Sequence, residues 1–183
     1  MATCSTLTSI LKSCDSNIGG IKAVWLWDME DQYLTSPEFS EDTTNWTITA
    51  LDITLHGPNT PVAYQFIRNS SNYTEEYSID LVNGSTYTTT TVTVNFSRRE
   101  AAKSKSIKLL AEGQRYLGAL VLDSNGIYWL FQDLQLSAST EGSGTAKADG
   151  SKYTVTLLAE TANFAKVVST VDAQDLINNG LFT

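Results

Sequence analysis

The dipeptide Asn83-Gly84 separates two long segments in which polar and apolar residues alternate. An Asn-Gly pair readily adopts the backbone conformation of a tight turn, and a period of two is typical of β-strands. The sequence therefore predicts a long β-hairpin over residues 73–96. If Asn83-Gly84 is a two-residue loop, counting outward places Tyr73 opposite Val94.

The two faces of this hairpin carry different side chains. One face is aromatic and aliphatic, with interruptions by Glu75 and several threonines, and can pack on a core. The other face is hydroxylated and mildly acidic. Besides Tyr87 it carries Thr74, Glu76, Ser78, Asp80, Thr89, Thr91 and Thr93. Long edge strands of this kind favour pairing with another copy of the chain.

Composition narrows the possible functions. The 183 residues include 12 Lys and Arg against 20 Asp and Glu, a net charge of −8, which argues against a protein that grips nucleic-acid phosphates over most of its surface. The 24 threonines favour strands, and one histidine leaves little room for a His-based active site. No apolar run reaches 18 residues, so neither a transmembrane helix nor a membrane partner is expected.

The rest of the chain is predicted to be mainly β with one flanking α-helix. Residues 1–20 are small and polar and are interpreted as an N-terminal arm, and residues 21–183 as a single domain. No secretory signal is expected at the start of the chain. Further strands are predicted at 21–27, 47–55, 62–68, 116–122, 127–132 and 152–160, with a flexible loop at 141–147 and a short terminal helix at 172–178.

The flanking helix is predicted over residues 98–112. Ser97 and Glu100 have the spacing of a capping box, and Gly113 would end the helix. Residues 98–115 carry a local charge of +4, from six bases and two acids. Two interpretations stay open: a solvated basic face, or a patch that docks on the acidic segment of a neighbouring subunit. The two sides of that contact would be Arg98, Arg99, Lys103, Lys105 and Lys108 on the helix, and Asp28, Glu30, Asp31, Glu41 and Asp42 on the acidic segment.

Catalytic and metal-binding patterns are weak. A nucleophilic site would have to use His56, which lies in a predicted turn without a Gly-x-Ser-x-Gly elbow. Carboxylates such as Glu76 sit on a predicted exposed strand, where nothing raises the pKa of a catalytic acid. Cys4 and Cys14 lack the partners of a zinc site and are expected to be reduced thiols. No enzyme activity, cofactor or metal is therefore predicted.

The order of these elements resembles the tail-tube fold of tailed bacteriophages, in which a small β-sandwich or barrel carries a long hairpin and a flanking helix. The amino-acid sequence of the second half is similar to that of virion proteins of Bacteroides-infecting phages, including crAss-like phages. The passages that carry the likeness are Gly19-Gly20-Ile21-Lys22, residues 120–130 from Leu120 to Leu130, and residues 143–150 from Ser143 to Gly150 with the strand that follows.

The resemblance implies a structural virion protein that forms a homo-oligomeric ring in the tail or neck. Hairpins of neighbouring copies would join into a barrel lining the DNA ejection channel, with the polar hairpin face toward the lumen. Double-stranded DNA would pass transiently, without sequence-specific binding. The implied partners are adjacent rings, portal or tail proteins, and the implied location is the virion, after synthesis in the host bacterial cytoplasm.

Two other functions compete with this interpretation. A carbohydrate- or surface-binding β-sandwich, such as a capsid decoration or fibre module, would be a monomer or trimer with exposed tryptophans. A small hydrolase would depend on His56. A ring-forming protein would tolerate the loss of that side chain.

Overall fold

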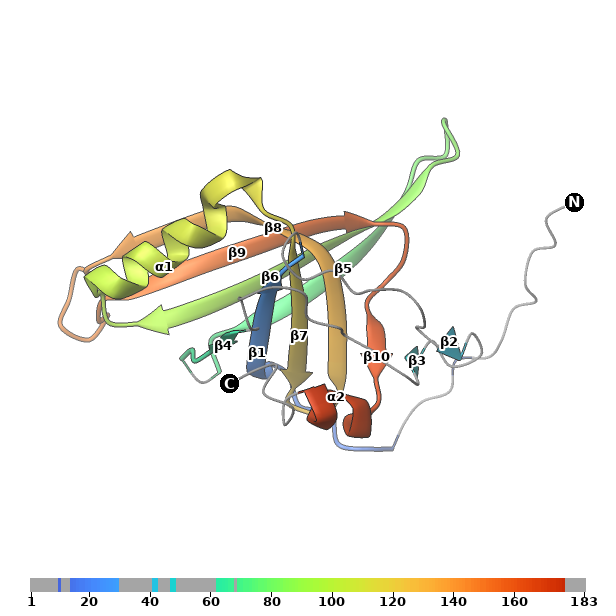
Figure 1. Cartoon of the computed structure of the whole chain (residues 1–183), viewed down its shortest axis with the longest axis horizontal. Coiled ribbons are helices and arrows are strands. Elements are labelled where there is room, and N and C mark those ends of the chain that lie inside the picture. The colour runs from blue at the N-terminus through green and yellow to red at the C-terminus, as the bar shows by residue number, and fades with distance from the viewer. Residues whose placement is uncertain are drawn as a thin grey trace, which may run out of the picture.

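The computed structural model describes residues 10, 14–29, 41–42, 47–48, 62–67 and 69–176. It is mainly antiparallel β with a flanking helix, as the sequence predicts (Figure 1). The elements are β1 (Ile21–Asp28), β2 (Glu41–Asp42), β3 (Thr47–Ile48), β4 (Val62–Tyr64), β5 (Asn72–Ile79), β6 (Thr86–Ser97), α1 (Ala101–Ala111), a 3-10 turn (Glu112–Gln114), β7 (Leu117–Asp123), β8 (Tyr128–Gly142), β9 (Lys152–Thr161), β10 (Lys166–Val168) and α2 (Thr170–Leu176).

The strands form two sheets that share β8. The first sheet has the order β2-β3-β10-β8-β7-β1-β4, and the second has the order β5-β6-β9-β8. The start of β8 pairs with β7 as far as Leu134, and the rest pairs with β9 from Gln135 onward. Asp133, at the change of partner, has a φ of 58°. Figure 1 shows the strands of the second sheet crossing those of the first.

The main core lies between the two sheets. Alternate residues of β6 and β9, among them Val92 and Leu157, face Val24, Val121 and Leu134 of the first sheet, and all of these are buried. Helix α1 adds Ile107 and Leu110 to this core. A smaller cluster covers the other face of the first sheet and includes Trp27, Leu120, Tyr128, Val168 and Ala173 of α2. The two sheets and α2 thus form three layers.

Trp27 explains a glycine in β7. Gly118 is paired with Trp27, and a Cβ built on Gly118 would lie 2.2 Å from the indole ring. Any side chain at position 118 would therefore displace the ring from the smaller core.

The predicted hairpin is present, but its register differs from the prediction by two residues. Tyr73 pairs with Val92, whereas the two-residue loop places it opposite Val94. The Asp80 carboxylate accepts hydrogen bonds from the backbone N–H groups of Val82 and Asn83, and this holds residues 81–84 in a longer loop. Because the shift is an even number of residues, each side chain keeps its predicted face.

The predicted start of the flanking helix is wrong. Ser97 ends β6 and pairs with Lys152, and Arg98 has a φ of 57°, so α1 begins three residues later than predicted, at Ala101. The Tyr153 hydroxyl accepts a hydrogen bond from the Glu100 N–H at 2.9 Å, in place of a local cap. Continued pairing of β6 with β9 therefore outweighs the capping-box pattern.

The second half of the chain differs from the prediction at two boundaries. β8 continues to Gly142, into the segment expected to be a flexible loop. Helix α2 starts at Thr170 and has a Ser-x-x-Asp cap, in which the Ser169 hydroxyl accepts a hydrogen bond from the Asp172 N–H at 3.2 Å. His56, Trp46 and Cys4 lie outside the described residues.

Candidate functional site

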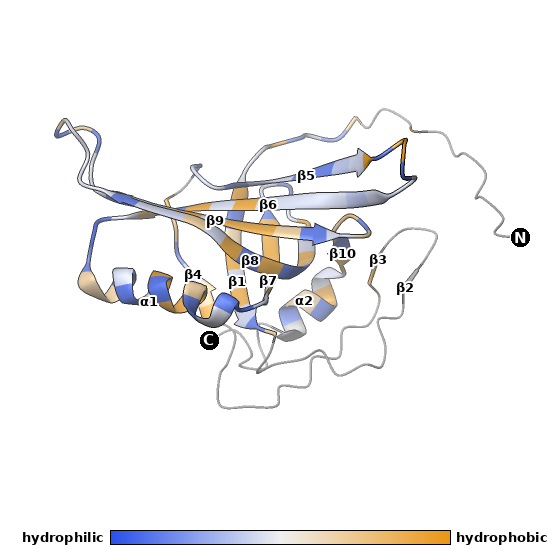
Figure 2. Cartoon of the chain, turned by 90° about the horizontal axis from the view of Figure 1, so that it is seen from above, coloured by the Kyte–Doolittle hydropathy of each residue, from blue (hydrophilic) through white to orange (hydrophobic). Residues whose placement is uncertain are grey.

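The candidate site is the outer face of the second sheet, on the side away from the main core. We call it the hydroxyl face. It spans four strands, and its rows follow from the pairing. Thr74 pairs with Thr91, and Thr93 pairs with Thr156 of β9. Most of these side chains are half-buried against one another. Figure 2 shows β5 and β6 mostly in pale or hydrophilic colours.

The predicted channel-lining residues occupy this face, with one exception. Six of them lie on β5 or β6 within it, namely Thr74, Glu76, Ser78, Thr89, Thr91 and Thr93. Asp80 lies beyond the end of β5, at the base of the hairpin loop. Hydrogen bonds from Asn83 and Val82 lower the pKa of Asp80 below its ordinary value, so its carboxylate is charged at neutral pH and organises the loop.

The structure adds residues that the sequence prediction missed. Thr154, Thr156 and Glu160 of β9 continue the rows of β6, and Thr140 of β8 pairs with Thr154. Alternation along residues 152–160 predicts the strand, and with it which residues share a side. Its place beside β6 depends on long-range pairing, which no local pattern specifies.

Charge on the hydroxyl face is confined to its margins. Glu76 and Glu160 flank Thr89 in one row near the hairpin loop. Lys152, paired with Ser97, lies at the opposite end. The eight residue steps from Thr89 to Ser97 separate these ends by roughly 26 Å at about 3.3 Å per residue. The centre of the face is therefore neutral, with threonine hydroxyls around one apolar residue, Leu158, which pairs with Thr91.

Glu75, which interrupts the apolar side of the hairpin, has a structural role. Its carboxylate accepts hydrogen bonds from the Ala165 N–H at 2.7 Å and from the Thr90 hydroxyl at 3.2 Å. Glu75 thus holds the connection between β9 and β10 against the hairpin by a hydrogen bond. Tyr77 packs on Phe164 of the same connection, with ring centroids 5.6 Å apart.

Two edges of the second sheet are open within the described residues. β5 pairs only with β6, and residues 135–142 of β8 pair only with β9. The pairings β5–β6, β6–β9 and β9–β8 are all antiparallel, so the two open edges run in opposite directions. Each edge presents backbone donors and acceptors to a further strand.

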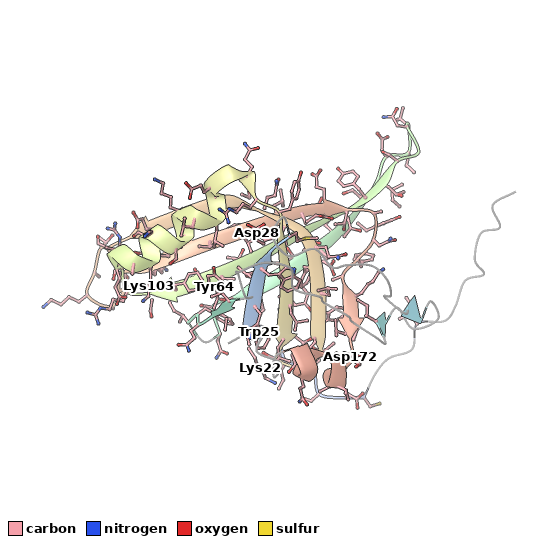
Figure 3. The ribbon with its side chains drawn as sticks, viewed as in Figure 1. Lys22, Trp25, Asp28, Tyr64, Lys103 and Asp172 are labelled. Carbon is pink, nitrogen blue, oxygen red and sulfur yellow. The ribbon has the colours of Figure 1, made fainter. Side chains whose placement is uncertain are left out.

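The predicted basic patch is partly neutralised within the chain. Arg99 lies 3.0 Å from Glu141, and both Arg98 and Lys103 contact Glu100. Lys105 and Lys108 are exposed and form no ion pair with a described residue. Figure 3 shows Lys103 at the end of the molecule away from the hairpin loop.

The predicted acidic partner is only partly described. Asp28 forms an ion pair of 2.8 Å with Arg115 of the same chain, and its side chain is 12% exposed. Glu41 and Asp42 form β2, which pairs with β3. Glu30 and Asp31 lie outside the described residues. Asp28 is thus paired with a base within its own chain, and docking between subunits stays a prediction.

Titratable groups away from the hydroxyl face have structural partners. Asp123 accepts hydrogen bonds from the Ile127 N–H and from the Trp129 indole, and thereby stabilises the turn between β7 and β8. Burial, with the nearby Asp123 and Glu75 carboxylates, raises the pKa of Tyr73 to about 12. Within the described ranges, no group of three or more His, Cys, Asp or Glu side chains could hold a metal ion.

Comparison with known proteins assigns no family. No protein-family model and no curated protein matches this chain. Among the described helices, none is both long and apolar enough to cross a membrane.

Proposed function

We propose that this chain is a structural virion protein that closes into a homo-oligomeric ring in a phage tail or neck. The hydroxyl face lines the channel through which DNA leaves the particle. Adjacent rings, the portal or other tail proteins are the neighbours above and below. The observation that carries this proposal is one four-stranded sheet that, within the described part of the chain, has two open edges and an uncovered, nearly neutral polar face.

Ring closure follows from the direction of the open edges. Because β5 and β8 run in opposite directions, β5 of one copy can pair antiparallel with β8 of the next, and the alternation continues around the ring. Such a contact is heterologous. The open β5 and β8 edges of every copy are all paired only when the ring closes. Closure removes the exposed edges that otherwise favour aggregation.

The chemistry of the hydroxyl face suits transient passage of a polyanion. Phosphates are held by lysine and arginine, and Lys152 lies only at the margin of this face. Glu76 and Glu160 repel phosphate near the other margin. The neutral threonines between them offer hydroxyl groups without a charge that would hold DNA in place.

The alternative of a carbohydrate-binding module has less support. This alternative predicts exposed tryptophans, whereas Trp27 is buried and Trp25 and Trp129 pack against the two cores. The half-buried indole of Trp129 also donates its N–H to Asp123. These three tryptophans therefore act in packing.

Electron microscopy and channel-specific labelling of the full-length protein test the proposal. Images should show closed rings with a central hole. In a background with Cys4→Ser and Cys14→Ser, a cysteine introduced by Thr91→Cys should react with a small maleimide but be protected from a long polyethylene-glycol maleimide. The matched control Val171→Cys, at a residue that is 68% exposed on α2, should react with both reagents.

Two results would contradict the ring proposal. One is a protein that stays monomeric at all concentrations. The other is equal reaction of the long reagent at positions 91 and 171 in assembled rings, because the hydroxyl face would then point outward.

A further inference from the structure

A cavity lies where the segment before β1 meets the turn between β7 and β8. Its volume is about 270 Å³, and its described walls are residues 17–20, Asn72 and Tyr73 of β5, and Asp123 and Asn125 of the turn. The Asn125 side chain accepts a hydrogen bond from the Ile18 N–H at 2.8 Å, and the Ser124 N–H donates to the Gly20 carbonyl at 3.0 Å. Contacts between distant parts of the chain thus hold the walls in place. We call this space the arm cavity.

The arm cavity contains a buried carboxylate. Asp123 is only 6% exposed, and its carboxylate accepts hydrogen bonds from the Ile127 N–H at 2.9 Å and from the Trp129 indole N–H at 3.1 Å. Both donors are neutral, and Asp123 forms no ion pair with a described residue. Buried charges in folded proteins are usually paired with an opposite charge. The cavity is the side from which a cation can reach this carboxylate.

The other walls of the arm cavity are neutral. Its described lining residues include no lysine, arginine or histidine, and asparagine side chains lie around the carboxylate. Burial, followed by the Asp123 and Glu75 carboxylates, raises the pKa of the Tyr73 phenol to about 12, so the phenol is uncharged at neutral pH. The carboxylate therefore sets the sign of the electrostatic potential, which repels anions and attracts cations.

The walls suit an organic cation better than a metal ion. Calcium takes about six to eight oxygen ligands, whereas Asp123 is the one carboxylate among the described lining residues. Ile18 and the Tyr73 ring add apolar surface, and the face of an aromatic ring attracts an ammonium group. An ammonium group donates hydrogen bonds in several directions, which carboxylate and amide oxygens can accept. A short alkyl chain with a terminal ammonium group therefore matches the arm cavity.

We infer that the arm cavity binds a primary alkylammonium group, with the Asp123 carboxylate as its counterion. The group belongs either to a free amine or to a lysine side chain of a second copy, and both sources share this chemistry. The inference goes beyond the proposed ring and does not depend on it, because Asp123 ends β7 of the first sheet. A bound ammonium group would join residues 17–20 to the turn between β7 and β8, and so stabilise the hydrogen bond of the Ile18 N–H.

Titration of the full-length protein with n-butylammonium chloride is the first test, because this ion has the length and charge of a lysine side chain. Saturable binding should shift the NMR signal of the Trp129 indole N–H, which donates to Asp123. It should also slow hydrogen exchange of the Ile18 N–H. The matched neutral compound 1-butanol should bind at least roughly tenfold more weakly. Calcium chloride at equal ionic strength should leave the Trp129 signal in place.

Variants locate the binding site. Asp123→Asn should raise the Kd for n-butylammonium at least roughly tenfold, whereas Asp133→Asn, at an exposed carboxylate outside the cavity, should leave the Kd unchanged. Asn72→Lys keeps Asp123 and both of its donors, and it places an ammonium group on the cavity wall that should compete with the ligand and also raise the Kd. Its control Asn163→Lys makes the same change in net charge at an exposed residue outside the cavity.

The dependence on protein concentration distinguishes the two sources of the ammonium group. An equal Kd in dilute and in assembled protein indicates a free amine. Loss of n-butylammonium binding on assembly, with weaker self-association of Asp123→Asn, indicates a lysine of a second copy. Equal binding of 1-butanol, a Trp129 shift produced by calcium at lower concentrations, or an unchanged Kd in Asn72→Lys would overturn the inference and leave the ring standing. Failure to form rings, with n-butylammonium still bound, would overturn only the ring.

Discussion

Threonines lie on both faces of β6, but in different surroundings. On the inner face Thr88 and Thr90 are 0% and 3% exposed, in line with Val92 and Val94 of the main core. On the outer face Thr89, Thr91 and Thr93 remain half-buried. The run of threonines predicts a strand, but the first sheet decides which hydroxyls are buried and which stay available for contact.

Substitution of one residue on each face of β6 should give the largest difference in the free energy of unfolding. Val92→Asp places a carboxylate between the two sheets and should lower the free energy of unfolding by more than about 4 kcal/mol. Thr91→Asp, the neighbouring residue on the outer face, should change it by about 1 kcal/mol or less. Urea unfolding followed by circular dichroism measures both. Similar losses in the two variants would mean that the outer face is also covered.

A smaller effect tests which residue caps α1. Tyr153→Phe removes the hydroxyl that receives the Glu100 N–H and donates to the Glu100 carbonyl at 3.0 Å. It should cost about 1–2 kcal/mol of unfolding free energy, because a partly buried N–H loses its acceptor. Ser97→Ala should cost under about 0.5 kcal/mol, since Ser97 is a strand residue. A larger loss of unfolding free energy in Ser97→Ala than in Tyr153→Phe would show that the capping box indicated by the sequence does form.

The smallest effect concerns the loop of the long hairpin at acid pH. The pKa of Asp80 is lowered in the folded chain by hydrogen bonds from Asn83 and Val82. Its contribution to loop order is therefore fully present above the unfolded pKa and is lost as the pH falls through the lower, folded value. A carboxyl chemical-shift titration by NMR should give a midpoint below the ordinary value, and the Val82 and Asn83 amide signals should shift with it. A midpoint at or above the ordinary value would show that the loop does not depend on Asp80.

Local patterns predicted most strands and the polarity of the hairpin faces. Alternation in residues 86–96 and 152–160 survives in β6 and β9 because each of these strands has one buried face, whereas β5 alternates only between exposed and half-buried residues as far as Glu76. The hairpin register was wrong because Asp80 accepts hydrogen bonds within the loop, a local competitor that the Asn-Gly rule does not include. Half of the hydroxyl face was missed because it belongs to β9 and β8, whose pairing depends on long-range contacts.

The two Ser-x-x-acid motifs also show that a local pattern does not decide the structure alone. Ser169 and Asp172 cap α2, whereas Ser97 and Glu100, with equal spacing, do not cap α1. Ser97 remains paired with Lys152 at the end of β6, so its backbone is extended. The motif is sufficient only where no neighbouring strand competes for the same residue.

β8 has a mechanical consequence for the proposed channel. One unbroken backbone from Tyr128 to Gly142 belongs first to the sheet inside the molecule and then to the sheet proposed as the channel wall. Tension or shear applied to the wall by moving DNA therefore passes along covalent bonds into the three-layered body. Peeling the wall away from the body would require breaking the hydrogen-bond ladder of β8 with β7 or β9, so the wall and its support deform as one unit.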